Sequence, residues 1–297
     1  MGASIYFIAN KFIRQSSRVG GCMSIKSKSV LTGVLVAALL LAAGTAAALS
    51  VSGSTTVLPF GASCAEEFNA AQSAVQVSVT GGGSGVGIKN VAEGISDVAM
   101  ASRPVKDSEK EAYPDEEFVE VLAAYDAVCI AVSQAVYDAG VTELSAEEVR
   151  AIYNGEITSW AQLGGDDEKI YVLGREVGSG TRDTFNEIVM GSDKAETPGV
   201  TTSHGSNAEV KTALTKSDRA IGYLGLNYIM DGALAAIAFE GVEPSAETIK
   251  DGSYPLAREL YMVTYGEPTE DAQAFLDFVT GDDGQAIAEE LGFVSIL

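Results

Sequence analysis

The chain has 297 residues, with 19 Lys and Arg against 41 Asp and Glu, one His, three Cys and a formal charge of −22. This acidic balance excludes a nucleic-acid-binding protein, because phosphate backbones are bound by clustered Lys and Arg. A single His excludes a multi-His metal site and leaves little room for Ser-His-Asp catalysis. The length suggests about two structural units, and we expect a folded, acidic protein without metal or cofactor.

The first 49 residues differ from the rest in charge. Residues 1–49 hold five Lys and Arg and no Asp or Glu, so the remaining chain has 14 against 41, a net charge of −27. The basic part leads into an uncharged apolar run, Ser29–Leu49, that contains an Ala46-x-Ala48 pattern. This order is typical of a secretory signal peptide, although about 20 apolar residues could also anchor the chain in a membrane. We expect an exported protein, extracellular or periplasmic, that starts at Met1 or Met23. Cleavage is favoured over tethering through residues 29–49, because sequence motifs begin directly after this run.

Cysteine usage fits export without requiring a disulfide. Cys22 lies in the expected signal segment, which leaves Cys64 and Cys129 as one possible pair. Both lie in apolar runs, where a buried free thiol is the commoner state. An oxidising compartment would also permit a bridge between them.

Beyond residue 49, short strand-like runs alternate with amphipathic helical stretches. Such alternation predicts an α/β fold with mostly parallel sheets. The acidic stretch Asp107–Glu120 is expected to be the solvated face of a helix. Ser145, with Glu148 three residues later, is typical of a helix-capping box. In chain order we expect a strand at Leu49–Gly53, a helix at Thr56–Ala71, strands at Val75–Val79 and Val98–Ala101 with a helix at Ile88–Glu93 between them, a strand at Tyr125–Val132, a helix at Glu143–Asn154, a strand at Ile170–Gly174, helices at Thr181–Met190 and Ala208–Thr215, strands at Ala220–Leu224 and Glu259–Thr264, and a helix at Ala272–Thr280.

Three segments rich in Gly, Ser and Thr each join an expected strand to an expected helix. They are Ser52–Thr56, Gly81–Gly87 and Arg175–Arg182. Free N–H groups and the positive end of a helix dipole attract anions at such positions. Glycines permit close approach of the main chain, and hydroxyls add rotatable donors. One such loop would usually be a helix cap, but three in one chain predict a site for a tetrahedral oxyanion.

Other phosphate and nucleophile motifs are not met. Gly82-xxxx-Gly87 continues into Ile88-Lys89-Asn90, so it is not a P-loop, and Gly178-Ser179-Gly180 is not GxSxG. His204 is the only candidate base, and we expect it to be a loop residue. A secreted phosphatase with Ser179 or Ser84 as its nucleophile would therefore lack a base and a metal cluster, so we expect no enzyme.

Several motifs together resemble a known family. They occur in the family's order between Ser52 and Leu297 and read SGSTTVLP, GGGSGVGI, ASRPV, IYNGEITSW, REVGSGTRDTF and YPLARELYMVTYG. In these motifs the chain resembles the phosphate-binding proteins of phosphate ABC transporters, which form the PstS family of class II periplasmic-binding proteins. The resemblance implies a two-lobed Venus-flytrap fold that closes over its ligand. Lobe 1 would comprise residues 50–126 and 258–297, and lobe 2 residues 127–257.

The resemblance also implies a function and a set of site residues. The protein would be a monomer that captures inorganic phosphate and delivers it to the permease subunits of an ABC importer. The three loops selected above are those that would bind the anion. Carried over by motif, the donors from lobe 1 would be Ser54, Thr55 and Ser84, with Thr56 assisting, and those from lobe 2 would be Arg175, Ser179, Gly180 and Thr181.

Departures from the family pattern leave the selectivity for phosphate open. Many relatives have a carboxylate at the position of Arg103, where it would accept the proton of hydrogen phosphate and exclude sulfate. An unmatched buried lone pair costs ~1–3 kcal/mol, and more when it is charged. Arg103 suggests a subgroup in which Ser102 and Arg103 face the anion, and Asp126 is either the replacement acceptor or a lobe-crossing residue paired with an arginine. Val177 also replaces an acidic residue often found after the site arginine. Binding of sulfate or molybdate, or a role as a phosphate scavenger or sensor, therefore stays an alternative.

Overall fold

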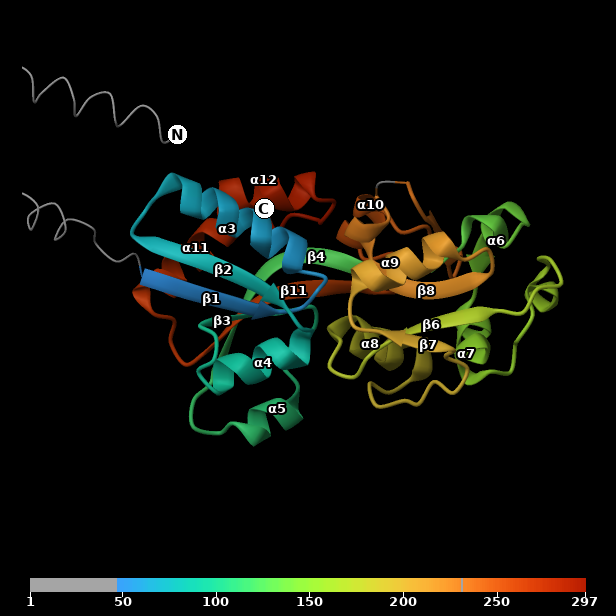
Figure 1. Ribbon diagram of the computed structural model, residues 1–297, viewed down its shortest axis with the longest axis horizontal. Coiled ribbons are helices and arrows are strands. Elements are labelled where there is room, and N and C mark those ends of the chain that lie inside the picture. Colours follow the sequence, from blue (N-terminus) through green and yellow to red (C-terminus); the bar gives the residue numbers. More distant parts are fainter. Residues whose placement is uncertain (1–46, 231) are drawn as a thin grey trace, which may run out of the picture. The chain divides into compact units, whose positions relative to one another are not determined.

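The computed structural model describes residues 47–230 and 232–297 (Figure 1). Residues 1–46 of the expected signal or anchor segment lie outside the described residues. Its last three positions belong to the first strand, where Leu49 is buried. Among the described residues, no helix has the length and apolar character needed to cross a membrane.

Strands and helices alternate along the described chain. The predicted α/β class is confirmed, and most predicted elements form within a few residues of their expected bounds. In order they are β1 (Ala47–Gly53), α3 (Leu58–Ala71), β2 (Val75–Gly81), α4 (Ser84–Ala92), β3 (Val98–Ala101), α5 (Asp107–Ala112), β4 (Phe118–Val132), α6 (Gln134–Asp138), β5 (Glu143–Leu144), α7 (Ala146–Asn154), η1 (Trp160–Leu163), β6 (Tyr171–Arg175), α8 (Gly180–Phe185), η2 (Asn186–Met190), β7 (Thr202–His204), α9 (Asn207–Lys216), β8 (Ala220–Gly225), η3 (Leu226–Tyr228), β9 (Ala235–Ala236), β10 (Ala238–Phe239), α10 (Ala246–Lys250), β11 (Ala257–Tyr265), α11 (Glu270–Thr280) and α12 (Asp282–Glu290).

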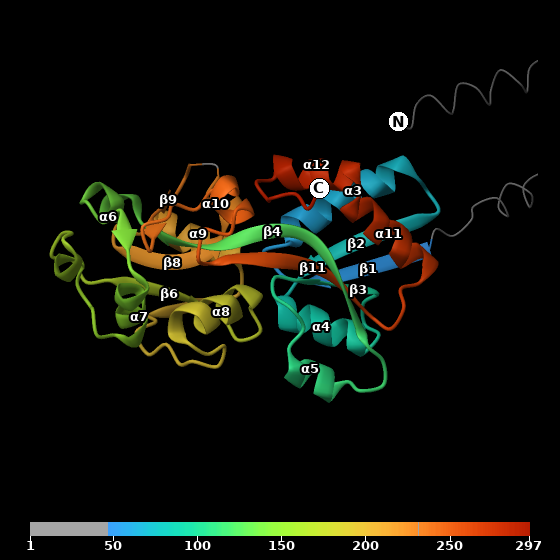
Figure 2. The same ribbon diagram turned by 180° about the vertical axis from the view of Figure 1, so that it is seen from behind.

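Two long strands connect two groups of parallel strands. The sheet order is β2-β1-β3-β11-β4-β8-β6-β7. The first group is parallel, with β1 between β2 and β3, and the second is parallel, with β6 between β7 and β8. β4 and β11 pair antiparallel with each other and with the two groups, and β4 also pairs antiparallel with the short strand β9. Figure 2 shows β4 and β11 running side by side from one group to the other.

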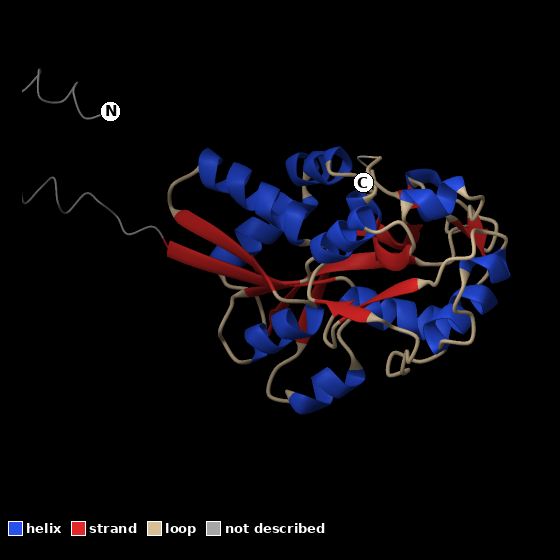
Figure 3. Ribbon diagram, turned by 45° about the vertical axis from the view of Figure 1, so that its right-hand side comes forward, coloured by secondary structure: helices blue, strands red, loops and turns tan. Residues whose placement is uncertain are grey.

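Each parallel group has its own hydrophobic core. One core holds Phe60, Met100 and Phe275, and draws its members from residues 49–124 and 260–293. The other holds Tyr153 and Trp160 and draws on residues 127–256, together with one residue near the C-terminus. Helices flank the strands of both groups (Figure 3). Burial of apolar side chains is the main favourable term in folding, so each group has its own source of stability.

Local differences from the predicted elements have identifiable causes. The acidic stretch Asp107–Glu120 is not one helix: α5 ends at Ala112 and β4 begins at Phe118. Pro114 lies between them, and proline lacks the N–H that a continuing helix needs. The capping box before α7 is confirmed, because Ser145 accepts a hydrogen bond from the Glu148 N–H at 3.3 Å and donates its own N–H to the Glu148 carboxylate at 2.8 Å.

The two described cysteines are free thiols in different cores. Cys64 and Cys129 are both fully buried, the first in the core of β1–β3 and the second in the core of β6–β8. Burial raises the pKa of Cys64 to about 12, so its reactive thiolate is scarce at neutral pH.

We expect neither thiol to react with Ellman's reagent in the folded protein and both to react after unfolding without a reductant. A Cys22→Ser chain restricts the assay to these two groups. Absence of free thiol in the unfolded protein would show that a bridge exists after all.

Candidate functional site

The three loops selected from the sequence meet in the structure. They follow the carboxyl ends of β1, β2 and β6, and two of them lead directly into α4 and α8. Backbone hydrogen bonds join them: the Gly83 N–H donates to the Gly53 carbonyl at 2.8 Å, and the Gly85 N–H donates to the Gly178 carbonyl at 3.0 Å. Segments more than 90 residues apart in sequence therefore form one site.

The predicted hydroxyl residues lie buried at this meeting point. Ser84 Oγ lies 3.2 Å from Ser102 Oγ and accepts the Ser102 N–H at 3.1 Å. A Cβ atom at Gly180 would lie 2.5 Å from Ser102 Oγ and closer still to Ser84 Oγ. The α8 start thus packs so tightly on these two serines that only glycine fits. The buried hydroxyl residues are Ser54, Thr55, Thr56, Ser84, Ser102, Ser179 and Thr181.

Arg175 is a buried cation with neutral partners. Its Nε donates to the His204 carbonyl at 3.1 Å, and its Nη2 donates to Thr55 Oγ1 and the Gly205 carbonyl, each at 3.1 Å. Its Nη1 is buried and has no hydrogen-bond partner among the described residues. Burial lowers the pKa of Arg175 to about 10. A desolvated guanidinium with a free donor is complementary to an anion, because charge-assisted hydrogen bonds to oxyanions are strong.

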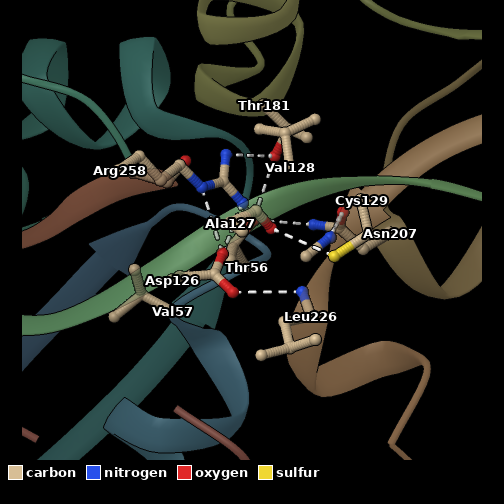
Figure 4. A network of polar contacts seen from close by, with 12 residues as sticks. Thr56, Val57, Asp126, Ala127, Val128, Cys129, Thr181, Asn207, Leu226 and Arg258 are labelled. Atoms are coloured by element: carbon tan, nitrogen blue, oxygen red, sulfur yellow. Dashed lines mark hydrogen bonds and ion pairs between the residues drawn. The ribbon is translucent and has the colours of Figure 1, made fainter. Parts of the chain in front are cut away.

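A second buried arginine, Arg258 on β11, was missed by the sequence analysis. Its Nε and Nη2 donate to Asp126 Oδ2 at 3.0 and 2.7 Å, and the Leu226 N–H donates to Asp126 Oδ1 at 3.0 Å (Figure 4). Its Nη1 also donates to Thr181 Oγ1 at 3.1 Å, and its Nη2 to Thr56 Oγ1 at 3.2 Å. Of the two roles considered for Asp126, this geometry favours the lobe-crossing partner of an arginine. The two residues are directly paired in the β4–β11 register, which the sequence alone does not reveal.

Asn207 at the start of α9 is the other residue that the sequence analysis missed. It is fully buried, and its Nδ2 donates to Thr55 Oγ1 at 3.2 Å and to Thr56 Oγ1 at 2.9 Å. Its Oδ1 accepts the Gly225 N–H at 3.3 Å. The only sequence signal for Asn207 was its position as a polar residue directly after Ser206, and Ser206 is the residue that caps the helix.

Arg103 is engaged by carboxylates. Its Nε donates to Asp183 at 2.7 Å, its Nη1 and Nη2 donate to Glu109 at 2.8 Å each, and its Nη1 donates to the Pro104 carbonyl at 2.8 Å. Burial opposes its charge, but Glu109 and Asp183 outweigh that effect and raise the pKa of Arg103. Four of the five N–H groups of the Arg103 guanidinium are thus used. The neighbouring Ser102, in contrast, lies among the buried hydroxyl residues of the site.

His204 lies in the short strand β7 and not in a loop. Its Nε2 lies 3.2 Å from Thr202 Oγ1, and it meets the site through its backbone carbonyl, which Arg175 contacts. In the described part of the chain, no three His, Cys, Asp or Glu residues are grouped so that they could hold a metal ion.

Comparisons with known proteins identify the family of this chain. The model of a PBP superfamily domain matches residues 41–283. The phosphate-binding protein PstS of Bacillus subtilis is 34% identical over 250 residues, which cover 84% of this chain and 80% of that protein. A structure from Clostridium perfringens, described as a phosphate ABC transporter substrate-binding protein with bound phosphate, is 33% identical, with a TM-score of 0.76 over 84% of this chain and all of that one. An ABC-type phosphate transport receptor from Vibrio cholerae is 32% identical, with a TM-score of 0.67 over 83% of this chain and 99% of that one. The chain therefore belongs to the PBP superfamily and, within it, to the PstS family of phosphate-binding proteins.

Proposed function

We propose that this protein captures inorganic phosphate and delivers it to an ABC importer. The observation that carries the proposal is Arg175, a buried cation whose Nη1 has no partner among the described residues. Related proteins described as phosphate-binding support the same ligand. Capture of an anion at this point would supply the partner that the guanidinium lacks.

The anion would be bound mostly by neutral donors. Hydroxyls, N–H groups at strand-to-helix turns and one guanidinium are sufficient for an oxyanion, so a strongly acidic protein needs no basic surface to bind phosphate. Salt screens the repulsion between exposed charges beyond ~10 Å at 0.1 M. We assign the contacts to Ser54, Thr55, Ser84, Ser102, Arg175, Ser179, Gly180 and Thr181, with Thr56, Arg103 and Asp126 behind them.

Capture would proceed by closure of two lobes. We place lobe 1 at residues 50–126 and 258–297 and lobe 2 at 127–257, and the separate hydrophobic cores support this division. Contacts that join the two would form on closure, among them Gly85 to Gly178, Thr55 to Arg175 and the ion pair of Arg103 with Asp183 at 2.7 Å. The closed form would dock as a monomer on the permease outside the membrane, in keeping with the export pattern of residues 1–49.

Gly180→Ala tests the closure directly. The added methyl would overlap Ser84 and Ser102. Because these serines belong to the proposed lobe 1 and Gly180 to lobe 2, the overlap would oppose closure, so we expect phosphate affinity to fall by ~10-fold or more while the melting temperature without phosphate stays near the wild-type value. Gly205→Ala is the matched control, because its methyl would meet no atom nearer than 3.6 Å. Equal affinity of Gly180→Ala and wild type would contradict this packing.

Calorimetric titration with phosphate, sulfate and molybdate tests the function. Calorimetry is preferable to tryptophan emission, because the single tryptophan, Trp160, is buried and its indole N–H donates a hydrogen bond to the Arg219 carbonyl. We expect micromolar or tighter binding of phosphate and much weaker binding of the other anions. Tight binding of sulfate or molybdate without phosphate would overturn the assignment. Turnover of p-nitrophenyl phosphate would point to an enzyme instead.

A further inference from the structure

We infer that Asn207 and Arg258 are positioning residues that fix the direction of the site hydroxyls, so that Thr55 and Thr181 present their hydrogens to the anion while Thr56 does not. The inference rests on the proposed binding of phosphate and adds two residues behind the contact shell. It follows from counting donors and acceptors around three threonine oxygens. A hydroxyl can donate one hydrogen bond and accept two.

The amide of Asn207 has only one possible orientation. Its oxygen accepts the backbone N–H of Gly225 at 3.3 Å, and a backbone N–H can only donate. The amide nitrogen must therefore face the two threonines, one hydrogen to Thr55 Oγ1 at 3.2 Å and the other to Thr56 Oγ1 at 2.9 Å. Asn207 is fully buried, so water does not compete for these hydrogens.

Thr56 is thereby forced to donate to Thr181. Thr56 Oγ1 accepts from Asn207 at 2.9 Å and from Arg258 Nη2 at 3.2 Å, which fills both of its lone pairs. Its contact with Thr181 Oγ1 at 3.0 Å must then use the Thr56 hydrogen. Figure 4 shows these side chains converging from α9, β11 and α8.

Two hydroxyl hydrogens remain for a ligand. Thr181 Oγ1 accepts from Thr56 and from Arg258 Nη1 at 3.1 Å. Thr55 Oγ1 accepts from Asn207 and from Arg175 Nη2 at 3.1 Å. Both oxygens are saturated as acceptors, so each threonine can act toward a bound molecule only as a donor. Asp126 holds Arg258 in place with Nε and Nη2 bonds to one carboxylate oxygen.

This arrangement makes the closed site complementary to an acceptor-rich ligand. Hydroxyl rotors normally turn to suit either a donor or an acceptor. Here the contacts of Asn207 and Arg258 that join the two lobes set these directions as the lobes close, which favours an oxyanion over a ligand that donates hydrogen bonds. Thr56 is the relay that connects Asn207 to Thr181 across the site.

A double-mutant cycle on phosphate affinity tests the inference. Asn207→Ala and Thr55→Val should each weaken binding by ~10-fold or more. Because Asn207 acts in part through the Thr55 hydroxyl, the double variant should lose about 10-fold less than the product of the two losses. Thr55→Ser, which keeps the hydroxyl, should bind within ~3-fold of wild type.

Asn186→Ala is the matched control, because Asn186 is also fully buried and donates to two backbone carbonyls, those of Asp193 and Ala195. It should leave phosphate affinity unchanged in the wild type, and it should add no further loss to that of Thr55→Val. If Asn207→Ala fails to fold, Asn207→Ser replaces it in the cycle. Strictly multiplicative losses for Asn207 and Thr55 would overturn the inference, whereas absence of phosphate binding by the wild type would overturn the proposed function instead.

Discussion

Arg175→Met is expected to weaken phosphate binding by ~100-fold or more. The variant keeps the length of the side chain but removes the charge and the unpartnered Nη1. A hydrogen bond to a charged group contributes about 1.5–3 kcal/mol, and loss of the one cation among the contacts assigned to the anion adds to this. Isothermal titration calorimetry in phosphate-free buffer measures the change.

The same substitution should cost the unliganded protein little. Burial lowers the pKa of Arg175 from its ordinary value to about 10, which corresponds to roughly 3 kcal/mol of destabilisation at neutral pH. Because the folded-state pKa is the lower one, this cost is present below about pH 10 and disappears as the pH rises from there toward the pKa of the unfolded chain. Relief of that cost should offset the lost hydrogen bonds to the His204 and Gly205 carbonyls. We expect the free energy of unfolding without phosphate to change by less than ~1 kcal/mol.

Arg150→Met serves as the control for charge. Arg150 is exposed and its Nε donates to the Val189 carbonyl, away from the site loops. It should bind phosphate within ~2-fold of wild type, because exposed charges are screened by salt. Comparable losses for Arg150→Met and Arg175→Met would mean that net charge, and not the site geometry, governs binding.

Asp126→Ala is expected to destabilise the fold by about 3–5 kcal/mol. The carboxylate is fully buried and its ion pair with Arg258 measures 2.7 Å. Removal of one partner leaves an uncompensated charge between the two hydrophobic cores. Urea unfolding with linear extrapolation measures the difference.

Glu168→Ala is the matched control for that experiment. Glu168 pairs with Arg219 at 3.8 Å on the surface, where the two side chains are 62% and 50% exposed. Such pairs contribute about 0–1 kcal/mol, so this variant should unfold near the wild-type midpoint. If Asp126→Ala were equally mild but shifted the preference from phosphate toward sulfate, Asp126 would be the ligand's proton acceptor and not the partner of Arg258.

Sequence patterns predicted the parallel strands well because those patterns are local. A run such as Val98–Ala101 is apolar throughout and reappears as β3 with the same bounds. The helix expected at Thr181–Met190 becomes α8 followed by a π-helical segment, since apolar periodicity does not distinguish a hydrogen bond to the fourth residue from one to the fifth. The strand that begins at Tyr125 was expected to be short, yet β4 begins at Phe118 because β11 pairs with its first part, up to Ala127.

The site was predicted in part for the same reason. Glycine and hydroxyl residues at strand-to-helix turns carry a local signature, and the structure brings their three loops together. Asn207 and Arg258 carry no such signature, because the site residues that they contact lie 77 or more residues away in sequence. Arg103 looked like an anion ligand beside Ser102, but its contacts with Glu109 and Asp183 appear only once two distant segments are placed side by side.

A crystal structure of the protein with phosphate tests the central claim most directly. We predict an oxyanion within hydrogen-bond distance of Arg175 Nη1 and of the Thr55 and Thr181 hydroxyls, with the Asp126–Arg258 pair intact behind it. An anion held elsewhere, or held without Arg175 Nη1, would contradict the account.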